Sequence, residues 1–201
     1  MCILERTPGG ATMHVHSSDK ILSDHELGNL KTSSTLFSKD GRLLACIGAE
    51  DVTVYDTKSN TILRTLPTPG SIAMHFSPSS TFITVYQKAN ASGAGDEKNL
   101  SVWAVASGEK VYACFQKSFN SASWPYLQFS KDDSIACRAV SNEVHFFRTD
   151  KFEEQATRLK VPQIALGKLS PGASPSVATF VPEKKGIPGA VAIYSPPPAG
   201  S

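Results

Sequence analysis

The stretch "FSKDGRLLA" at residues 37–45 returns almost unchanged as "FSKDDSIAC" at 129–137, and a looser copy, "FSPSSTFIT", stands between them at 76–84. Three copies of one nine-residue pattern, in a chain without low-complexity character, indicate an internal repeat. A repeat decides the architecture before any single site does, so we expect the chain to be built from repeated structural units.

Two anchors mark each unit. The first is an apolar residue followed by serine, at Phe37-Ser38, Phe76-Ser77, Phe129-Ser130 and Leu169-Ser170. The second is an aromatic residue in an alternating run, at Tyr55, Trp103, Phe147 and Tyr194. Successive aromatic anchors are 48, 44 and 47 residues apart (103−55, 147−103 and 194−147). A period of about 40–45 residues that holds four short strands is typical of one β-propeller blade.

The local chemistry of the repeat agrees with a turn between two strands. Phenylalanine buries a large apolar surface between neighbouring sheets, and serine and aspartate hydrogen-bond the backbone of a turn. Gly41 follows Asp40 in the first copy, and glycine readily adopts a positive φ. Each copy is therefore predicted to be the same turn between two strands of a blade.

The sequence predicts an all-β fold, an incomplete WD40-like β-propeller with about three complete blades plus a partial fourth. Residues 1–195 form this partial propeller, with 1–32 as an N-terminal strand region, and 196–201 form a truncated Pro-rich tail. "KANASGAGDEK" at 88–98 is predicted to be a surface loop. The segment 150–161, which has a weak helical pattern, is predicted to be a connection between blades. Because the fourth unit stops after Tyr194, we expect a truncated form or fragment whose open end exposes strand edges and an apolar face.

Composition is that of an ordinary globular chain of 201 residues, with 40% apolar and 19% charged residues and a formal charge of +2. This small charge excludes strong, purely electrostatic attraction to nucleic acid or anionic lipid. No signal-peptide core or membrane span is visible, so a cytoplasmic location without membrane contact is predicted. The four cysteines, Cys2, Cys46, Cys114 and Cys137, lack Cys-x-x-Cys spacing, and three of them read as core residues.

Specific strings carry a resemblance to a known family. "ASWPYLQFSKDDSIACRAVSNEVHFF" at 122–147, "LSPGASPSVATFVPEKKGIP" at 169–188 and "AVAIY" at 190–194 resemble the eukaryotic translation initiation factor 2A family, in a plant-like version. The run Asn142–Phe147 and the pattern Val181-Pro182-x-x-Lys185-Gly186-x-Pro188 weigh most. The resemblance extends from about residue 33 to residue 195.

The resemblance implies a many-bladed WD-like propeller followed by a lysine-rich helical tail, of which this chain is the N-terminal portion. It also implies association with the small ribosomal subunit and GTP-independent delivery of initiator methionyl-tRNA in alternative or stress-related initiation. Other initiation factors are implied as further partners.

The residues give no candidate catalytic, cofactor or metal site. His14 and His16 share a strand face but lack a third ligand, and "SGAGD" at 92–96 lacks the Lys-Ser or Lys-Thr of a phosphate-binding loop. No Gly-x-Ser-x-Gly string supports a nucleophile, so the chain is predicted not to be an enzyme. Asn90 and Asn99 match the glycosylation pattern by chance, in the absence of a secretory signal.

Two features could contact RNA. Trp124 is expected to be a buried aromatic that closes a blade, with an exposed base-stacking residue as the alternative. Lys184 and Lys185 form a loop pair that could reach a phosphate, although two solvated lysines are the ordinary case. Two functions therefore remain: a translation initiation factor, or a general protein-interaction propeller without an RNA role.

Overall fold

The structure, a computed structural model, describes residues 2–7, 10–17, 20–26, 34–88, 98–171 and 175–196, and for 2–26 only the backbone. The chain divides into two compact units: Met1–Met74 with Val85–Asn90, and His75–Thr84 with Ala91–Ser201. The predicted loop 88–98 lies outside the described residues except at its two ends.

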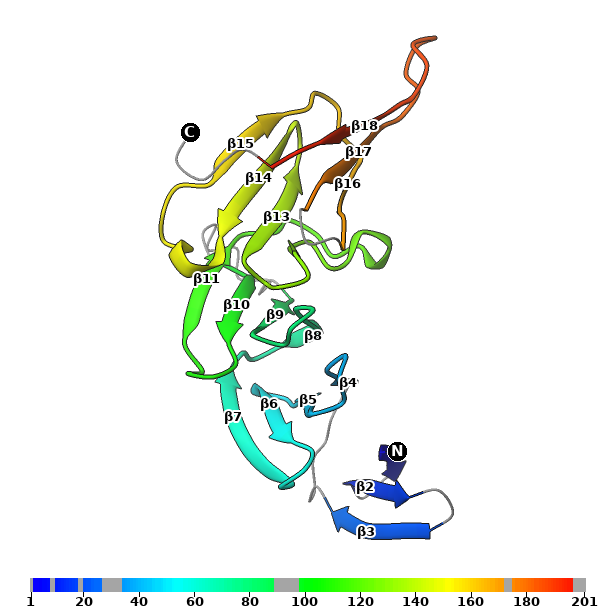
Figure 1. Cartoon of the computed structure of the whole chain (residues 1–201), viewed down its shortest axis with the longest axis vertical. Coiled ribbons are helices and arrows are strands. Elements are labelled where there is room, and N and C mark those ends of the chain that lie inside the picture. Colours follow the sequence, from blue (N-terminus) through cyan, green and yellow to red (C-terminus); the bar gives the residue numbers. More distant parts are fainter. Residues whose placement is uncertain are drawn as a thin grey trace. The chain divides into compact units, whose positions relative to one another are not determined.

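The described strands form five sheets, in each of which neighbouring strands follow the order of the chain (Figure 1). Three sheets have four strands each. One contains β4 (Ser34–Phe37), β5 (Leu43–Ile47), β6 (Asp51–Asp56) and β7 (Thr61–Pro67), and the next contains β8 (Ser71–Phe76), β9 (Phe82–Gln87), β10 (Leu100–Ala104) and β11 (Lys110–Cys114). The last of the three contains β12 (Gln128–Phe129), β13 (Ile135–Val140), β14 (Glu143–Arg148) and β15 (Thr157–Lys160). We call these the first, second and third blades. The predicted three complete blades are confirmed.

A fourth sheet has three strands, β16 (Leu166–Leu169), β17 (Val177–Val181) and β18 (Ala190–Tyr194). It is the predicted partial blade. The region predicted only as an N-terminal strand region contains an antiparallel sheet of three strands, β1 (Cys2–Thr7), β2 (Gly10–Ser17) and β3 (Lys20–Glu26).

Both kinds of anchor occupy equivalent places in the blades. Phe37, Phe76, Phe129 and Leu169 each end the first strand of a sheet, and Tyr55, Trp103, Phe147 and Tyr194 each lie in the third. The turns after the first strands are built alike, because Ser38 Oγ accepts the Leu43 N–H at 2.9 Å and Ser130 Oγ accepts the Ile135 N–H at 3.0 Å. The repeated string is therefore the turn between the first and second strands.

One secondary-structure prediction was wrong. The segment 150–161 contains only the end of the short 3-10 helix η2 (Thr149–Lys151), and its residues 157–160 form β15, the fourth strand of the third blade. Val144 pairs with Leu159 and Phe146 with Thr157, so tertiary pairing with β14 overrides the weak helical pattern. A further 3-10 helix among the described residues is η1 (Ser121–Ser123).

The second unit holds an apolar core between consecutive sheets. Its buried members are Phe82, Val102, Leu127, Phe129, Ala136, Phe147 and Phe152. The rings of Phe82 and Phe129 stack with centroids 5.5 Å apart. Phe82 follows the repeat turn of the second blade, and Phe129 precedes the repeat turn of the third. The expectation that the phenylalanines bury surface between neighbouring sheets is thus confirmed for this pair.

Candidate interaction surface

The structure adds no support for a metal site at His14 and His16 or for a nucleotide site at 92–96. His14 and His16 lie in β2, where only the backbone is described, and 92–96 lies outside the described residues. In the part of the chain that the structure describes, no three His, Cys, Asp or Glu side chains group as a metal site. No helix within that part is long and apolar enough to cross a membrane.

Three cysteines lie in packed strands of the blades. Cys46 and Cys137 are buried, and Cys114 is half-buried. Burial raises the pKa of Cys137 to about 12, so its thiol stays protonated and unreactive at neutral pH. Cys46 and Cys137 are core residues as predicted, whereas the Cys114 Sγ accepts a hydrogen bond from Arg138 at 2.7 Å.

Asn99, which matches the glycosylation pattern, is a buried structural residue in this fold. The residue is 4% exposed, and its side-chain amide both accepts from the Gln116 N–H at 2.7 Å and donates to the Gln116 carbonyl at 3.0 Å. The amide therefore fastens the chain after β11 to the start of β10.

Asp133 joins the second and third blades within the second unit. The residue is 2% exposed, and its carboxylate accepts the Ser77 hydroxyl at 2.6 Å and the backbone N–H groups of Ser79 and Thr81 at 3.2 Å. The turn 77–82 has no aspartate of its own. The carboxylate of Asp133, from the next blade, accepts the hydrogen bonds of this turn instead. Sequence reasoning missed this role, for which the only signal was "DD" in the third copy where the first has "DG".

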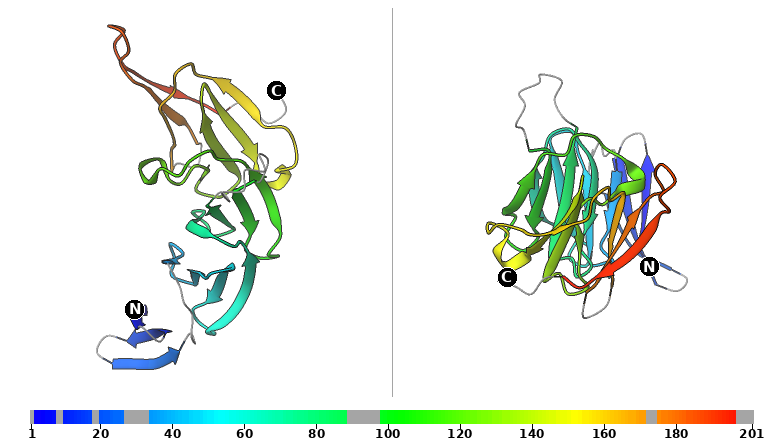
Figure 2. Two further views of the ribbon diagram at one scale, coloured as in Figure 1. Left: turned by 180° about the vertical axis from the view of Figure 1, so that it is seen from behind. Right: turned by 90° about the horizontal axis from the view of Figure 1, so that it is seen from above.

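Gln128 plays the equivalent part between the third blade and the fourth sheet. Its amide donates to the Gly167 carbonyl at 2.8 Å and accepts the Leu169 N–H at 3.0 Å. Strand β16 accordingly lies beside β13, as the front view and the view from behind both show (Figure 1 and Figure 2). This position, too, was not singled out from the sequence.

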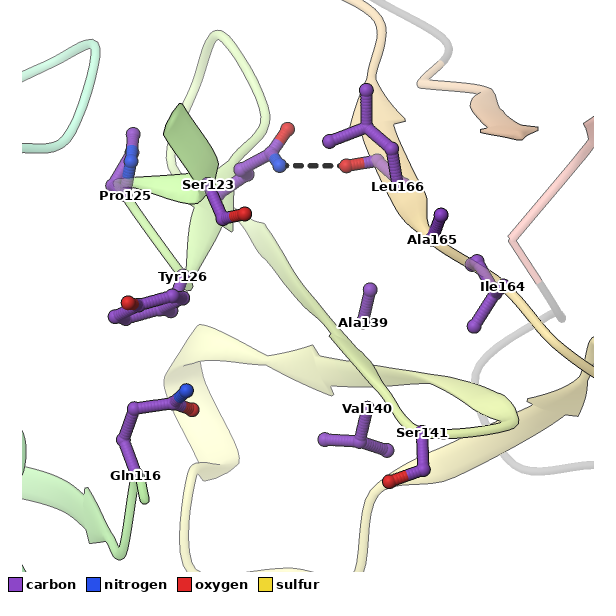
Figure 3. A pocket seen from close by; sticks show the side chains of 12 residues that line it. Gln116, Ser123, Pro125, Tyr126, Ala139, Val140, Ser141, Ile164, Ala165 and Leu166 are labelled. Atoms are coloured by element: carbon purple, nitrogen blue, oxygen red, sulfur yellow. Dashed lines mark hydrogen bonds between the residues drawn. The ribbon is translucent and has the colours of Figure 1, made fainter. Parts of the chain in front are cut away.

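A cleft of about 230 Å³ opens beside this junction. Pro125 and Tyr126 stand on one side, Ile164, Ala165 and Leu166 on the other, and the end of β13 with Ser141 lies between them (Figure 3). The lining residues are neutral: Gln116, Ser123, Pro125, Tyr126, Gln128, Ala139, Val140, Ser141, Ile164, Ala165, Leu166 and Gly167. Such a cleft suits an uncharged ligand.

Trp124 is half-buried and not a core aromatic, so the prediction of a buried residue was wrong. It belongs to a surface cluster with Phe119 and Tyr126, at centroid distances of 5.8 and 5.7 Å. The cluster lies in the segment between β11 and β12, and an aromatic cluster in a connection need not enter the core between sheets. Tyr126 brings this cluster to the cleft.

Lys184 and Lys185 lie exposed in the connection between β17 and β18, as predicted. This hairpin extends away from the third blade (Figure 1 and Figure 2). Four large apolar side chains of the same hairpin are also exposed, namely Phe180, Ile187, Val191 and Ile193. The fourth sheet thus presents both a cationic tip and an apolar face.

Comparison with known proteins places these features in a family. No protein-family model matches the chain. Proteins named eukaryotic translation initiation factor 2A match it with 36% identity in Schizosaccharomyces pombe and 30% in Dictyostelium discoideum, over 80% of the chain in both cases. The matched part is 28% and 27% of those relatives, so the chain spans little more than a quarter of their length.

Solved structures agree with the sequence relatives. A crystal structure of a eukaryotic initiation factor superposes with a TM-score of 0.82 and 28% identity, and the match covers 98% of this chain and 49% of that one. Kluyveromyces lactis Hsv2p, at 13% identity and a TM-score of 0.55, shares the fold alone. The plant-like character stays a prediction. The extent of the sequence matches, together with the superposition over 98% of the chain, establishes that the chain belongs to the eukaryotic translation initiation factor 2A family.

Proposed function

We propose that this chain is part of a cytoplasmic translation initiation factor and contacts the small ribosomal subunit through its blades. The observation that carries the proposal is the match to relatives named translation initiation factor 2A over 80% of the chain. The role is one of binding and not of catalysis, since a blade surface positions partners without a reacting group.

The cationic tip of the fourth sheet is the part of the proposal that can be tested residue by residue. Lys184 and Lys185 are exposed side by side on an extended hairpin, where two ammonium groups can approach a phosphate backbone. Two phosphate contacts predict modest affinity that falls about five- to sevenfold for a threefold rise in salt. Initiator methionyl-tRNA delivery is proposed for the whole factor, to which this chain contributes a platform.

The experiment is co-sedimentation of the 201-residue chain with purified small ribosomal subunits at about 50 and 150 mM salt. We expect binding at the lower salt, weakened in the K184A/K185A variant. K39A/K131A is the matched control, because Lys39 and Lys131 are exposed lysines of two repeat turns. The full-length S. pombe relative serves as the comparison for subunit binding and for retention of initiator tRNA.

A general protein-interaction propeller is the competing function, and the neutral cleft beside Tyr126 favours it. The two proposals predict different sedimentation results. If neither this chain nor the full-length relative sediments with subunits at the lower salt, the initiation-factor proposal fails and the protein-interaction function takes its place. Equal loss of binding in both lysine variants would contradict the assignment to the hairpin tip.

A further inference from the structure

The first strand of the third blade is shorter than its counterpart in the first blade. The two repeat turns are offset by 92 residues (129−37), so Tyr126 corresponds to Ser34 and Ala139 to Ile47. In the first blade Ser34 pairs with Ile47. In the third blade the ladder between β12 and β13 ends with Gln128 opposite Cys137. It stops two residues short of the equivalent pair, so Tyr126 does not pair with Ala139.

The backbone of Ala139 therefore faces an open strand edge. Val140 and Glu143 close a two-residue turn, so the peptide groups of Val140 and Arg138 are directed towards β14. The peptide groups of the alternate residues of β13, which include Ile135 and Ala139, are directed to the opposite edge. At that edge the Ile135 carbonyl accepts the Ser130 N–H at 2.8 Å. Within the described ranges, no residue hydrogen-bonds to the N–H or carbonyl of Ala139 on that edge.

The preceding segment is held away from this edge by its own side chains. The Tyr126 hydroxyl donates to the Ser118 carbonyl at 3.0 Å and accepts the Asn120 N–H. The Tyr126 ring also packs edge-on against Phe119 and Trp124. These contacts fold residues 118–126 onto themselves, so the chain reaches β13 only at Gln128 and the cleft occupies the place of the missing strand.

The walls of the cleft select against a charged ligand. Its lining holds no Asp, Glu, Lys or Arg. Arg138, which precedes the lining residue Ala139, is directed towards the seam with β11, where its guanidinium donates to Gln116 Oε1 at 2.7 Å and to the Phe115 carbonyl at 3.1 Å. A volume of about 230 Å³ is below the ~300–1,000 Å³ of sites that enclose a whole drug-sized ligand, which favours a short stretch of a longer partner.

We propose that this cleft binds an extended, uncharged peptide segment of a partner protein, which pairs with Ala139 as an added strand of the third blade. An unpaired strand edge offers the N–H and carbonyl that a peptide backbone needs, and neutral walls accept small side chains on either face. RNA fits this cleft less well, because no lining cation can meet its phosphates. The proposal is independent of ribosome binding.

The test uses an N-acetylated, C-amidated hexapeptide of alternating valine and threonine, whose binding is followed by isothermal titration calorimetry and by hydrogen–deuterium exchange of the protein. We expect saturable binding that slows exchange in the segment containing Ala139. N-methylation of alternate peptide residues is the matched ligand control, since it removes the N–H groups that would pair. Oligouridylate of similar length is the RNA probe.

Two variants report on the site. A139P removes only an N–H on an open edge, where proline is tolerated in a strand, and should weaken binding at least about fivefold. A165W fills the cleft from an exposed position and should abolish binding even if A139P fails to fold. A49W places the same side chain at an exposed position of the first blade and should bind as the wild type does.

Three outcomes would overturn the proposal. One is the absence of saturable binding up to about millimolar peptide, which corresponds to a binding free energy of only about 4 kcal/mol. Another is peptide binding that survives in A165W, or that protects segments other than 135–143. The third is binding of oligouridylate that the hexapeptide does not displace and that A165W abolishes. That result would make the cleft an RNA site.

Discussion

At the scale of single residues, Asp133 shows how one carboxylate can organise a turn in another blade. It satisfies a buried serine hydroxyl and two N–H groups of the segment 77–81. We predict that D133N lowers the free energy of unfolding by about 1–3 kcal/mol, because a neutral amide oxygen accepts these three hydrogen bonds more weakly than the charged Oδ2 that accepts them here. Asparagine tolerates the positive φ of 60° at this position, so the backbone is not the cause.

Chemical denaturation of wild type, D133N and D132N measures this effect. Asp132 is the matched control in the same turn, since its carboxylate is exposed and bonds only within its own turn, to Ser130 and Ser134. D132N should cost less than D133N. Equal losses in the two variants would show that the cross-blade contact adds nothing to stability.

At the scale of elements, the repeat turns of the first and third blades should respond to acid. Hydrogen bonds from Ser38 and then Arg42 lower the pKa of Asp40 to about 2, and those from Ser130 and Ser134 lower the pKa of Asp132 to about 2. Their ordinary value is 3.8, so the unfolded chain takes up these protons first as the pH falls. The stabilisation is therefore complete above about pH 4 and is lost as the pH falls towards 2.

The prediction is checked by melting temperatures between pH 5 and pH 2 for wild type and D40N/D132N. The wild type should lose more stability over this range than the variant, by a modest amount, because both carboxylates are exposed and solvent screens them. The two curves should converge at the acid end. Parallel curves across the range would refute a contribution of these turns to the pH dependence.

At the scale of the whole molecule, the fourth sheet should make the 201-residue chain self-associate. Phe180 lies opposite Val191 in the register of β17 and β18, and Ile193 lies opposite Ala178, so the exposed apolar side chains share one face. Val191 and Ile193 are 71% and 74% exposed on β18, the end strand of its sheet. A clustered apolar face beside a strand edge favours association between copies.

Analytical ultracentrifugation of wild type and V191K/I193K measures this association. The lysines should shift the chain towards the monomer without changing the β-type circular dichroism. I62K/I72K is the matched control, since Ile62 and Ile72 are exposed isoleucines of β7 and β8 and the change in charge is the same. A wild-type chain that is monomeric at tens of micromolar, or a control that dissociates equally, would contradict the assignment.

The sequence by itself determined the repeat and the order of the strands. The anchors at Phe37, Phe76 and Phe129 and the aromatics of the third strands predicted three complete blades and a partial fourth, because alternation and turn chemistry are local properties of the chain. The strings at 122–147, 169–188 and 190–194 carried the family resemblance. The Ser-Asp turn, with Gly41 at a positive φ of 72°, was likewise predicted from its own nine residues.

Only the tertiary structure decided how one blade meets the next. The roles of Asp133, Gln128 and Ala139 depend on atoms of another segment: Asp133 serves a turn more than 50 residues earlier, and Ala139 faces a strand that stops short. Residues 157–160 became a strand because β14 offered an edge, and Trp124 joined a surface cluster instead of the core. Pairing across sheets is set by spatial neighbours, and no local pattern in a single sequence encodes them.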